Sequence, residues 1–272
     1  MSIDLPAYYA RIGYEGPSEP TLAVLQDLHA RHPSRIAFEG LDPFLGRPVE
    51  IDPETIQAKL VQGRRGGYCH EHNALFHDVL ATLGFSVDAL GGRVVWMTPG
   101  RSTPGHRLTL INLADGLFIA DVGFGGQTPT APLRLEPGLE QPTTHGTYRL
   151  TRDGRVYENQ IRLNNRWEPM YRFTLDPQSH SDFEMANWFT STHPRGLFTQ
   201  NLVAARVVGG SRVNLFNATV TIRGPDGNLE QRTLADAQAL QQVLEEQLGL
   251  ELPVPAKTIW ARLPNQPVPN GP

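Results

Sequence analysis

Apolar residues in the first third of the chain recur at the spacing of amphipathic helices. Leu22, Leu25 and Leu28 share one helical face, which predicts a helix over residues 21–32 that stops at Pro33, because proline lacks a backbone N–H. Residues 1–84 as a whole are predicted to be helical. Two further helices run from Asp52-Pro53 to Gly63, and from Cys69 to Gly84 with Leu75, Val79 and Leu83 on one face.

After residue 85 the pattern changes to the short, turn-bounded segments of β-strands. Tight hairpin turns are predicted at Asp115-Gly116 and Asn164-Asn165, because these residues tolerate positive φ angles. This region is expected to form an antiparallel sheet or a small barrel. Its predicted strands are residues 87–96, 107–113, 117–122, 147–151, 156–163 and 167–173.

The last part of the chain mixes both patterns. A helical stretch near residues 183–189 precedes predicted strands over residues 203–208 and 213–222. A final amphipathic helix over residues 237–248 ends at Gly249. The tail from residue 264 is proline-rich, and we expect it to be flexible.

Composition excludes several classes of partner. Lys and Arg total 24 against 28 Asp and Glu, so we expect no binding of nucleic acid or of an acidic membrane surface. No apolar stretch approaches the roughly 18 residues that span a bilayer, and the first residues lack the features of a secretion signal. We therefore expect a cytoplasmic protein that acts on small molecules, as a monomer or a homodimer.

Cys69 is the single cysteine of the chain and follows the segment Arg65-Gly66-Gly67-Tyr68, where a glycine turn opens a predicted helix. One cysteine excludes an intrachain disulfide and fits a reducing compartment. The thiolate is the reactive form of cysteine, and a helix N-terminus or a nearby imidazolium stabilises it. Cys69 is therefore predicted to be a nucleophile rather than a small core residue, with backbone N–H groups around Tyr68 and Cys69 as candidate oxyanion donors.

A cysteine nucleophile needs a base, and nine histidines compete for that role. His70 and His72 follow Cys69 on one helix, where neither position faces the sulfur well. His106 begins a predicted strand after the glycine-containing segment 100–105, and a separate strand can bring an imidazole across from the sulfur. His106 is therefore the predicted base.

Asp121 is the candidate for orienting His106, because its apolar surroundings would make an unpaired buried carboxylate costly. The alternative is that Asp121 only caps a turn before Gly123. A two-residue turn at residues 115–116 would place Asp121 opposite Leu110, on the face of His106 but about 13 Å away. A hydrogen bond therefore requires a wider turn or a bulge that shifts the register by two residues per strand.

A metal site is an alternative for this segment, because potential ligands lie close together in the sequence at Cys69, His70, Glu71, His72 and His77. Their spacing does not fit, since position 74, four residues after the first histidine, is alanine. No second cysteine is present to complete a sulfur-rich zinc site. We therefore expect no metal, and we expect Glu71 and Asn73 to anchor the start of the helix through hydrogen bonds.

Together these segments resemble the arylamine N-acetyltransferases, in the same order and over nearly the whole chain. Residues 65–69 with Glu71 and Asn73 are similar to that family's nucleophile motif, and residues 36–41 look like its Phe-Glu-Asn-Leu segment, with Gly40 in place of asparagine. Residues 105–108 and 121–125 look like its histidine and aspartate segments. Residues 187–194, followed by Phe198, resemble the stretch that leads into its third domain.

The resemblance implies an α+β fold with a Cys-His-Asp core like that of cysteine proteases and transglutaminases. It divides the chain into a helical domain (1–84), a central antiparallel β-barrel (85–185) and an α/β lid (186–272). Acetyl-CoA would donate an acetyl group, through a thioester on Cys69, to the nitrogen of arylamines, hydrazines or N-hydroxyarylamines. The implied substrate contacts are Phe38, Val94, Phe124 and Phe198, and the implied CoA contacts are Thr103, Gly125 and Gly126.

Other functions use the same three residues. A cysteine hydrolase or transglutaminase-like amidase would pass the acyl group to water or to another amine, and an amide synthase would take it from a carrier instead of CoA. A catalytically silent binding protein is a third hypothesis, although it predicts degraded triad positions. An acetyl-enzyme formed from acetyl-CoA and discharged by an amine distinguishes the transferase from these alternatives.

Overall fold

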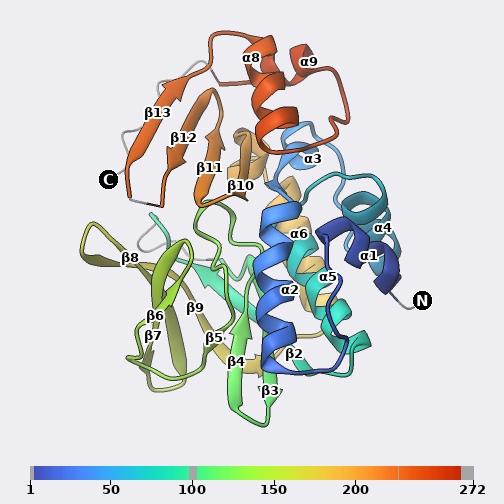
Figure 1. Ribbon diagram of the computed structural model, residues 1–272. Coiled ribbons are helices and arrows are strands. Elements are labelled where there is room, and N and C mark those ends of the chain that lie inside the picture. The colour runs from blue at the N-terminus through green and yellow to red at the C-terminus, as the bar shows by residue number, and fades with distance from the viewer. Residues whose placement is uncertain (1–2, 98–102, 226, 265–272) are drawn as a thin grey trace.

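The computed structural model describes residues 3–97, 103–225 and 227–264. Helices at the N-terminal end, a curved eight-stranded sheet and a five-stranded sheet with its own helices follow one another along the chain (Figure 1). The expected α+β architecture is confirmed. The proline-rich tail from residue 265 and the segment 98–102 lie outside the described residues.

Polar caps mark the starts of the N-terminal helices. The side chain of Thr21 accepts a hydrogen bond from the N–H of Val24 at 3.3 Å, and that of Asp52 accepts one from the N–H of Thr55 at 2.9 Å, as expected for N-cap residues. The helices are α1 (Leu5–Ile12), α2 (Leu22–Arg35), α3 (Leu41–Phe44), α4 (Pro53–Gln57) with the π-turn Ala58–Gln62, and α5 (Cys69–Thr82).

Pro33 does not end its helix, so that prediction was wrong. Helix α2 continues to Arg35, and the N–H of Ile36 donates to the carbonyl of His32 at 2.9 Å. Proline removes only its own hydrogen bond near the end of a helix. His32 is fully buried, and hydrogen bonds at both of its ring nitrogens hold it in a conformation that a following proline disfavours.

The eight-stranded sheet curls into a nearly closed antiparallel barrel. Its two edge strands, β5 and β6, are linked by the side chain of Gln141, which accepts a hydrogen bond from the backbone of Arg134 at 2.7 Å and donates one at 3.0 Å. In spatial order the strands are β5 (Leu133–Arg134), β4 (Gly116–Ala120), β3 (His106–Leu113), β2 (Ser86–Val94), β9 (Arg166–Pro177), β8 (Val156–Leu163), β7 (Gly146–Asp153) and β6 (Gln141–Thr143).

The β3–β4 hairpin turns one residue earlier than predicted. Leu113 pairs with Gly116, so the two-residue turn is 114–115 rather than 115–116. Gly116 has φ of 122°, a conformation that glycine adopts at low cost. Continued past the end of β4, this register sets Asp121 opposite residue 108, two residues from His106 instead of four. The earlier turn therefore supplies half of the four-residue change in strand register that brings Asp121 opposite His106.

The five-stranded sheet begins with a strand from the N-terminal region, because β1 (Phe38–Glu39) pairs with β10 (Val203–Val208). The single strand predicted over residues 213–222 is in fact two, since Asn217 has φ of 52° and reverses the chain so that Phe216 pairs with Thr219. The remaining elements are β11 (Ser211–Phe216), β12 (Thr219–Arg223), β13 (Leu229–Thr233), α8 (Ala237–Gln242) with the π-turn Val243–Gln247, and α9 (Ala256–Trp260).

Helix α6 (His180–Thr192) and the short α7 (Leu197–Gln200) lead from the barrel to the second sheet. In Figure 1, helices α2, α5 and α6 lie to the right of the two sheets. The side chain of Asn187 on α6 accepts a hydrogen bond from the hydroxyl of Tyr68 and donates one to the carbonyl of Val49 at 2.8 Å. Helix α6 thereby fixes the residue that precedes Cys69.

Candidate active site

Cys69 is the first residue of α5, and the chain before it is held by Glu71. One carboxylate oxygen of Glu71 accepts a hydrogen bond from the N–H of Tyr68 at 3.0 Å, and the other lies 2.6 Å from Nζ of Lys59. Glu71 thus anchors the start of the helix, as predicted. The N–H of Tyr68 therefore donates to Glu71. The prediction that this N–H stabilises an oxyanion was wrong.

The glycine pair before Tyr68 is required by close backbone packing. A Cβ atom on Gly66 would lie 2.0 Å from the carbonyl oxygen of Ala37, and one on Gly67 would lie 2.8 Å from a carboxylate oxygen of Glu71. The carbonyl of Gly67 also accepts a hydrogen bond from the N–H of Glu39 at 2.7 Å. The glycines therefore let strand β1 lie against the segment that carries the cysteine.

A buried ion network supports the same segment. Nζ of Lys59 lies 2.6 Å from Asp42 as well as from Glu71, and Nη2 of Arg65 lies 2.7 Å from Glu39. These contacts join α5, the glycine segment and the chain after β1. Removing one member would leave charges buried without their partner.

The structure brings the three predicted catalytic residues together. Nε2 of His106 lies 2.8 Å from a carboxylate oxygen of Asp121, and both side chains are buried. Nδ1 is thereby the ring nitrogen left for the cysteine. The thiol of Cys69 also donates to the carbonyl oxygen of Gly105, with 3.4 Å between sulfur and oxygen.

Asp121 has several further hydrogen bonds beyond the one to His106. Its second carboxylate oxygen accepts from Nδ2 of Asn73 at 2.9 Å and from the N–H of Gly123 at 3.0 Å, so it caps the turn as well as pairing with His106. Burial alone would raise the pKa of Asp121. The charge of His106 and these hydrogen bonds outweigh burial and lower that pKa.

The contact with Asp121 keeps His106 protonated. Burial alone would lower the pKa of its imidazole. The charge and hydrogen bond of Asp121, with a smaller contribution from Cys69, overcome burial and raise the pKa of His106 to about 10. A protonated imidazole next to the sulfur is the arrangement that stabilises a thiolate nucleophile.

Comparison with known proteins agrees with this geometry. A family model described as N-acetyltransferase matches residues 21–257. The arylamine N-acetyltransferase of Mycobacterium tuberculosis is 44% identical over 260 residues, covering 93% of this chain and 91% of that protein. The chain belongs to the arylamine N-acetyltransferase family.

Other members of the arylamine N-acetyltransferase family are similar over almost their whole length. The Escherichia coli enzyme is 42% identical over 92% of this chain and 90% of its own. The structure of the Mycobacterium marinum enzyme in complex with CoA has a TM-score of 0.88 at 41% identity, covering 91% of this chain and 93% of that one. The Mycobacterium smegmatis enzyme has a TM-score of 0.92 at 37% identity, covering 97% and 100%.

The aromatic residues that the arylamine N-acetyltransferase resemblance named lie near His106 or near Tyr68, the residue before Cys69. The ring of Phe124 packs edge-on against His106 with 5.3 Å between centroids, and Phe38 lies 5.9 Å from Phe198. Phe198 in turn packs edge-on against Tyr68 at 5.3 Å. Val94 ends β2 and pairs with residue 171, whose ring contacts both His106 and Phe124.

The residues expected to contact CoA occupy two places. Thr103 lies beside Gly105 and lines an apolar groove of about 340 Å³ along α6. Gly125 and Gly126 form a short 3₁₀ turn, in which a Cβ on Gly126 would lie 2.7 Å from Oδ1 of Asn214. A side chain at position 126 would therefore displace Asn214 of β11 from its present position.

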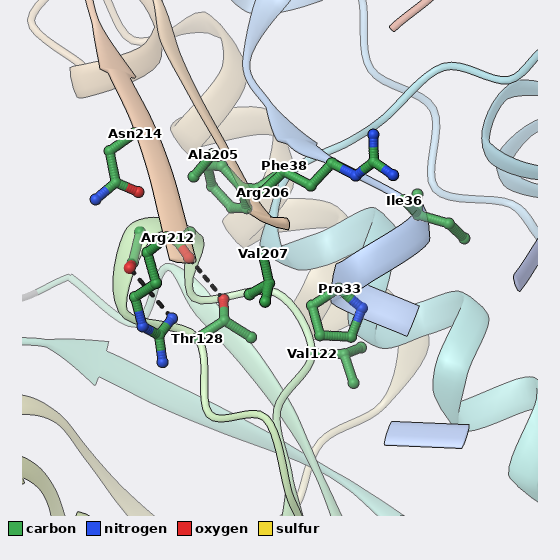
Figure 2. A pocket seen from close by; sticks show the side chains of 12 residues that line it. Pro33, Ile36, Phe38, Val122, Thr128, Ala205, Arg206, Val207, Arg212 and Asn214 are labelled. Carbon is green, nitrogen blue, oxygen red and sulfur yellow. Dashed lines mark hydrogen bonds between the residues drawn. The ribbon is translucent and has the colours of Figure 1, made fainter. Parts of the chain in front are cut away.

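The turn formed by residues 125–127 lies against the second sheet (Figure 2). Arg212 is buried and donates hydrogen bonds to the carbonyls of Gly126 and His145 and to the hydroxyl of Tyr148. The cavity between this turn and the sheet has a volume of about 10 Å³, which holds no more than about one water molecule. A cosubstrate contacting the turn would have to approach it from the other side.

His70 and His72 are both buried, and neither is the base that pairs with Asp121. Nδ1 of His72 is hydrogen-bonded to Nε2 of His32 at 2.9 Å, and Nε2 of His72 to the carbonyl of Ala37 at 3.0 Å. Burial lowers the pKa of His72 to about 4. Burial, and then the charges of His106 and Arg107, lower the pKa of His70 to about 3. Both rings are therefore neutral near pH 7.

The prediction that Asn73 anchors the start of its own helix was wrong, because its side chain is hydrogen-bonded to Asp121 and to the backbone of Arg107 and Val122. A position four residues after Cys69 lies on the same face of the helix, and that spacing was a usable signal. Sequence reasoning also missed His29, whose Nε2 accepts a hydrogen bond from the N–H of Asp121 at 3.2 Å. No local pattern links residues this far apart in the chain.

Within the described ranges, no cluster of three or more His, Cys, Asp or Glu side chains has the arrangement of a metal site. None of the helices in the same ranges has the length and apolar character of a membrane span.

Proposed function

We propose that this chain transfers an acetyl group from acetyl-CoA to the nitrogen of arylamines or hydrazines, through an acetyl-thioester on Cys69. The observation that carries the proposal is the buried His106–Asp121 pair beside the only thiol. Membership of the arylamine N-acetyltransferase family supports the donor and the acceptor class, and a CoA complex is known for the Mycobacterium marinum relative.

In the first step the Cys69 thiolate attacks the carbonyl carbon of the acetyl thioester. A bond forms between Sγ and that carbon, and the bond from carbon to the CoA sulfur breaks. His106, protonated beforehand, gives its proton to the departing CoA thiolate, so that CoA leaves as the thiol. Asp121 keeps the proton on Nε2 and leaves Nδ1 as the nitrogen that exchanges protons with the reacting groups.

In the second step the acceptor nitrogen attacks the acetyl carbon on Cys69. The new bond joins nitrogen to carbon, and the bond from carbon to Sγ breaks. His106, now neutral, takes the proton that the amine loses, which restores the imidazolium and the thiolate together. Because Glu71 engages the N–H of Tyr68, the first-turn N–H of Cys69 is the better candidate to stabilise the oxyanion in both steps.

We propose that different residues contact the two substrates near Cys69. Phe38, Phe124 and Phe198 would contact the acetyl and aryl groups, with Val94 at the edge of this region. Thr103, beside the carbonyl that accepts from the thiol, and the turn at Gly125 and Gly126 are the proposed CoA contacts. Exchange of the two substrates at one cysteine requires a ping-pong sequence.

The test is intact-protein mass spectrometry after mixing the full chain with acetyl-CoA and no acceptor. We expect one added acetyl group in the wild type, none in Cys69→Ala, and its loss when an arylamine or hydrazine is added. No adduct on folded wild-type protein would contradict the proposed donor. An adduct that decays in buffer as fast as with amine would instead identify a hydrolase.

A further inference from the structure

Arg107, which directly follows His106, is a buried cation whose Nε has no hydrogen-bond partner among the described residues. Its exposed fraction is 6%, and Nε is fully enclosed. The guanidinium carbon lies over the ring of Phe183, 4.5 Å from its centroid. Burial lowers the pKa of Arg107 and the charge of Asp78 partly offsets this, which leaves the pKa at about 10, so the group is charged near pH 7.

Arg107 is one of the residues that line a cavity of about 340 Å³ between α5, β2 and the start of α6. The cavity is separate from the proposed catalytic site, since none of Cys69, His106 and Asp121 lines it. Its volume is at the lower end of the range for small-molecule sites. Its apolar walls include Ala74, Val87 and Phe183.

We propose that this cavity binds a small organic monocarboxylate with an apolar body. A guanidinium fork matches a carboxylate with two parallel hydrogen bonds, and such charge-assisted pairs are strong when shielded from water. The apolar walls would contact the rest of the ligand. The proposal goes beyond the acetyl transfer and does not depend on it.

The other charged groups on the cavity wall favour a single negative charge. Asp78 and Asp88 also line it, and they would repel a phosphate or a dicarboxylate more than a monocarboxylate. Asp78 is itself hydrogen-bonded to Nδ1 of His77 at 2.9 Å, and its charge also acts on Arg107. His180 completes the titratable groups of the lining.

The experiment is a ligand-observed NMR titration of the full chain with benzoate, after alkylation of Cys69 by iodoacetamide to obstruct the catalytic pocket. We expect saturable binding of benzoate, and much weaker binding of benzamide, which has the same shape without the charge. Arg107→Met should weaken benzoate binding about tenfold to a hundredfold, as expected for loss of a charge-assisted pair. Arg155→Met, at an exposed arginine of the barrel, is the matched control and should bind as the wild type does.

Asp78→Asn keeps the proposal testable if Arg107→Met does not fold. Removing a competing carboxylate from the wall should tighten benzoate binding several-fold. Absence of saturable benzoate binding to the alkylated wild type would overturn the proposal. So would equal affinity for benzamide and benzoate, or unchanged binding in a folded Arg107→Met variant.

Discussion

Nδ2 of Asn73 donates a hydrogen bond to Asp121 at 2.9 Å, so the helix that begins with Cys69 also holds the aspartate. The same amide donates to the carbonyl of Arg107 at 2.6 Å and accepts from the N–H of Val122 at 2.9 Å. One side chain thus fixes the residue after His106 and the residue after Asp121. The relative placement of the three proposed catalytic residues therefore depends on Asn73.

Replacement of Asn73 by alanine should slow acetylation of Cys69 by about 10- to 100-fold, because small misplacements of reacting groups are costly. Single-turnover mass spectrometry with acetyl-CoA measures this rate. Thr82→Ala, at an exposed position near the other end of α5, is the control and should react at the wild-type rate. An unchanged rate in a folded Asn73→Ala variant would show that Asp121 is positioned without the amide.

Replacement of Asp121 by asparagine should lower the rate of acetyl transfer by about 10⁴-fold. An amide facing Nε2 of His106 favours the wrong tautomer, and it no longer stabilises the imidazolium. The measurement is kcat/KM for a hydrazine acceptor, with Asp115→Asn in the exposed hairpin turn as the control. A loss of less than about tenfold would remove Asp121 from the proposed triad.

The sequence correctly predicted that His106 and Asp121 lie on the same face of the sheet, although the predicted position of the hairpin turn was wrong. Moving a two-residue turn by one position changes a residue's partner by two, and side chains alternate with a period of two, so the face is preserved. The sequence therefore indicated the right face and the wrong distance. The exact register depends on the conformation at Gly116, where φ is 122°.

Local sequence patterns do not predict contacts between segments that are far apart in the chain. Nothing near Arg212 in the sequence indicates that its three acceptors are two backbone carbonyls and a tyrosine hydroxyl of the barrel region. The pairing of β1 with β10 could not be predicted either, because a strand of two residues is too short to show an alternating pattern. Pro33 was misjudged for a related reason, since the contacts of His32 decide the outcome.

Replacement of Lys59 by methionine should destabilise the protein by about 3 kcal/mol, because it leaves two largely buried carboxylates without their shared cation. Asp42 and Glu71 each lie 2.6 Å from its Nζ. Chemical denaturation at pH 7 measures the free energy of unfolding. Lys257→Met, outside this network on α9, is the control, and a loss below about 0.5 kcal/mol in Lys59→Met would mean that the network contributes little.

Replacement of His70 by phenylalanine should make the protein less sensitive to acid. The folded state lowers the pKa of His70 to about 3, whereas an unfolded histidine titrates near about 6.5. As the pH falls below about 6.5, the unfolded chain gains a proton at this residue that the folded chain does not, so stability falls by about 1.4 kcal/mol per pH unit. Phenylalanine removes this contribution and leaves no buried nitrogen without a partner.

The measurement is the free energy of unfolding of wild type and His70→Phe at pH 7 and at pH 5. Between these values the wild type should lose about 2 kcal/mol more than the variant. Phenylalanine suits the site because the ring of His70 already packs edge-on against Tyr68 and Phe183, at 5.5 Å and 6.2 Å. Equal acid sensitivity in wild type and His70→Phe would mean that the folded protein protonates His70 as readily as the unfolded chain.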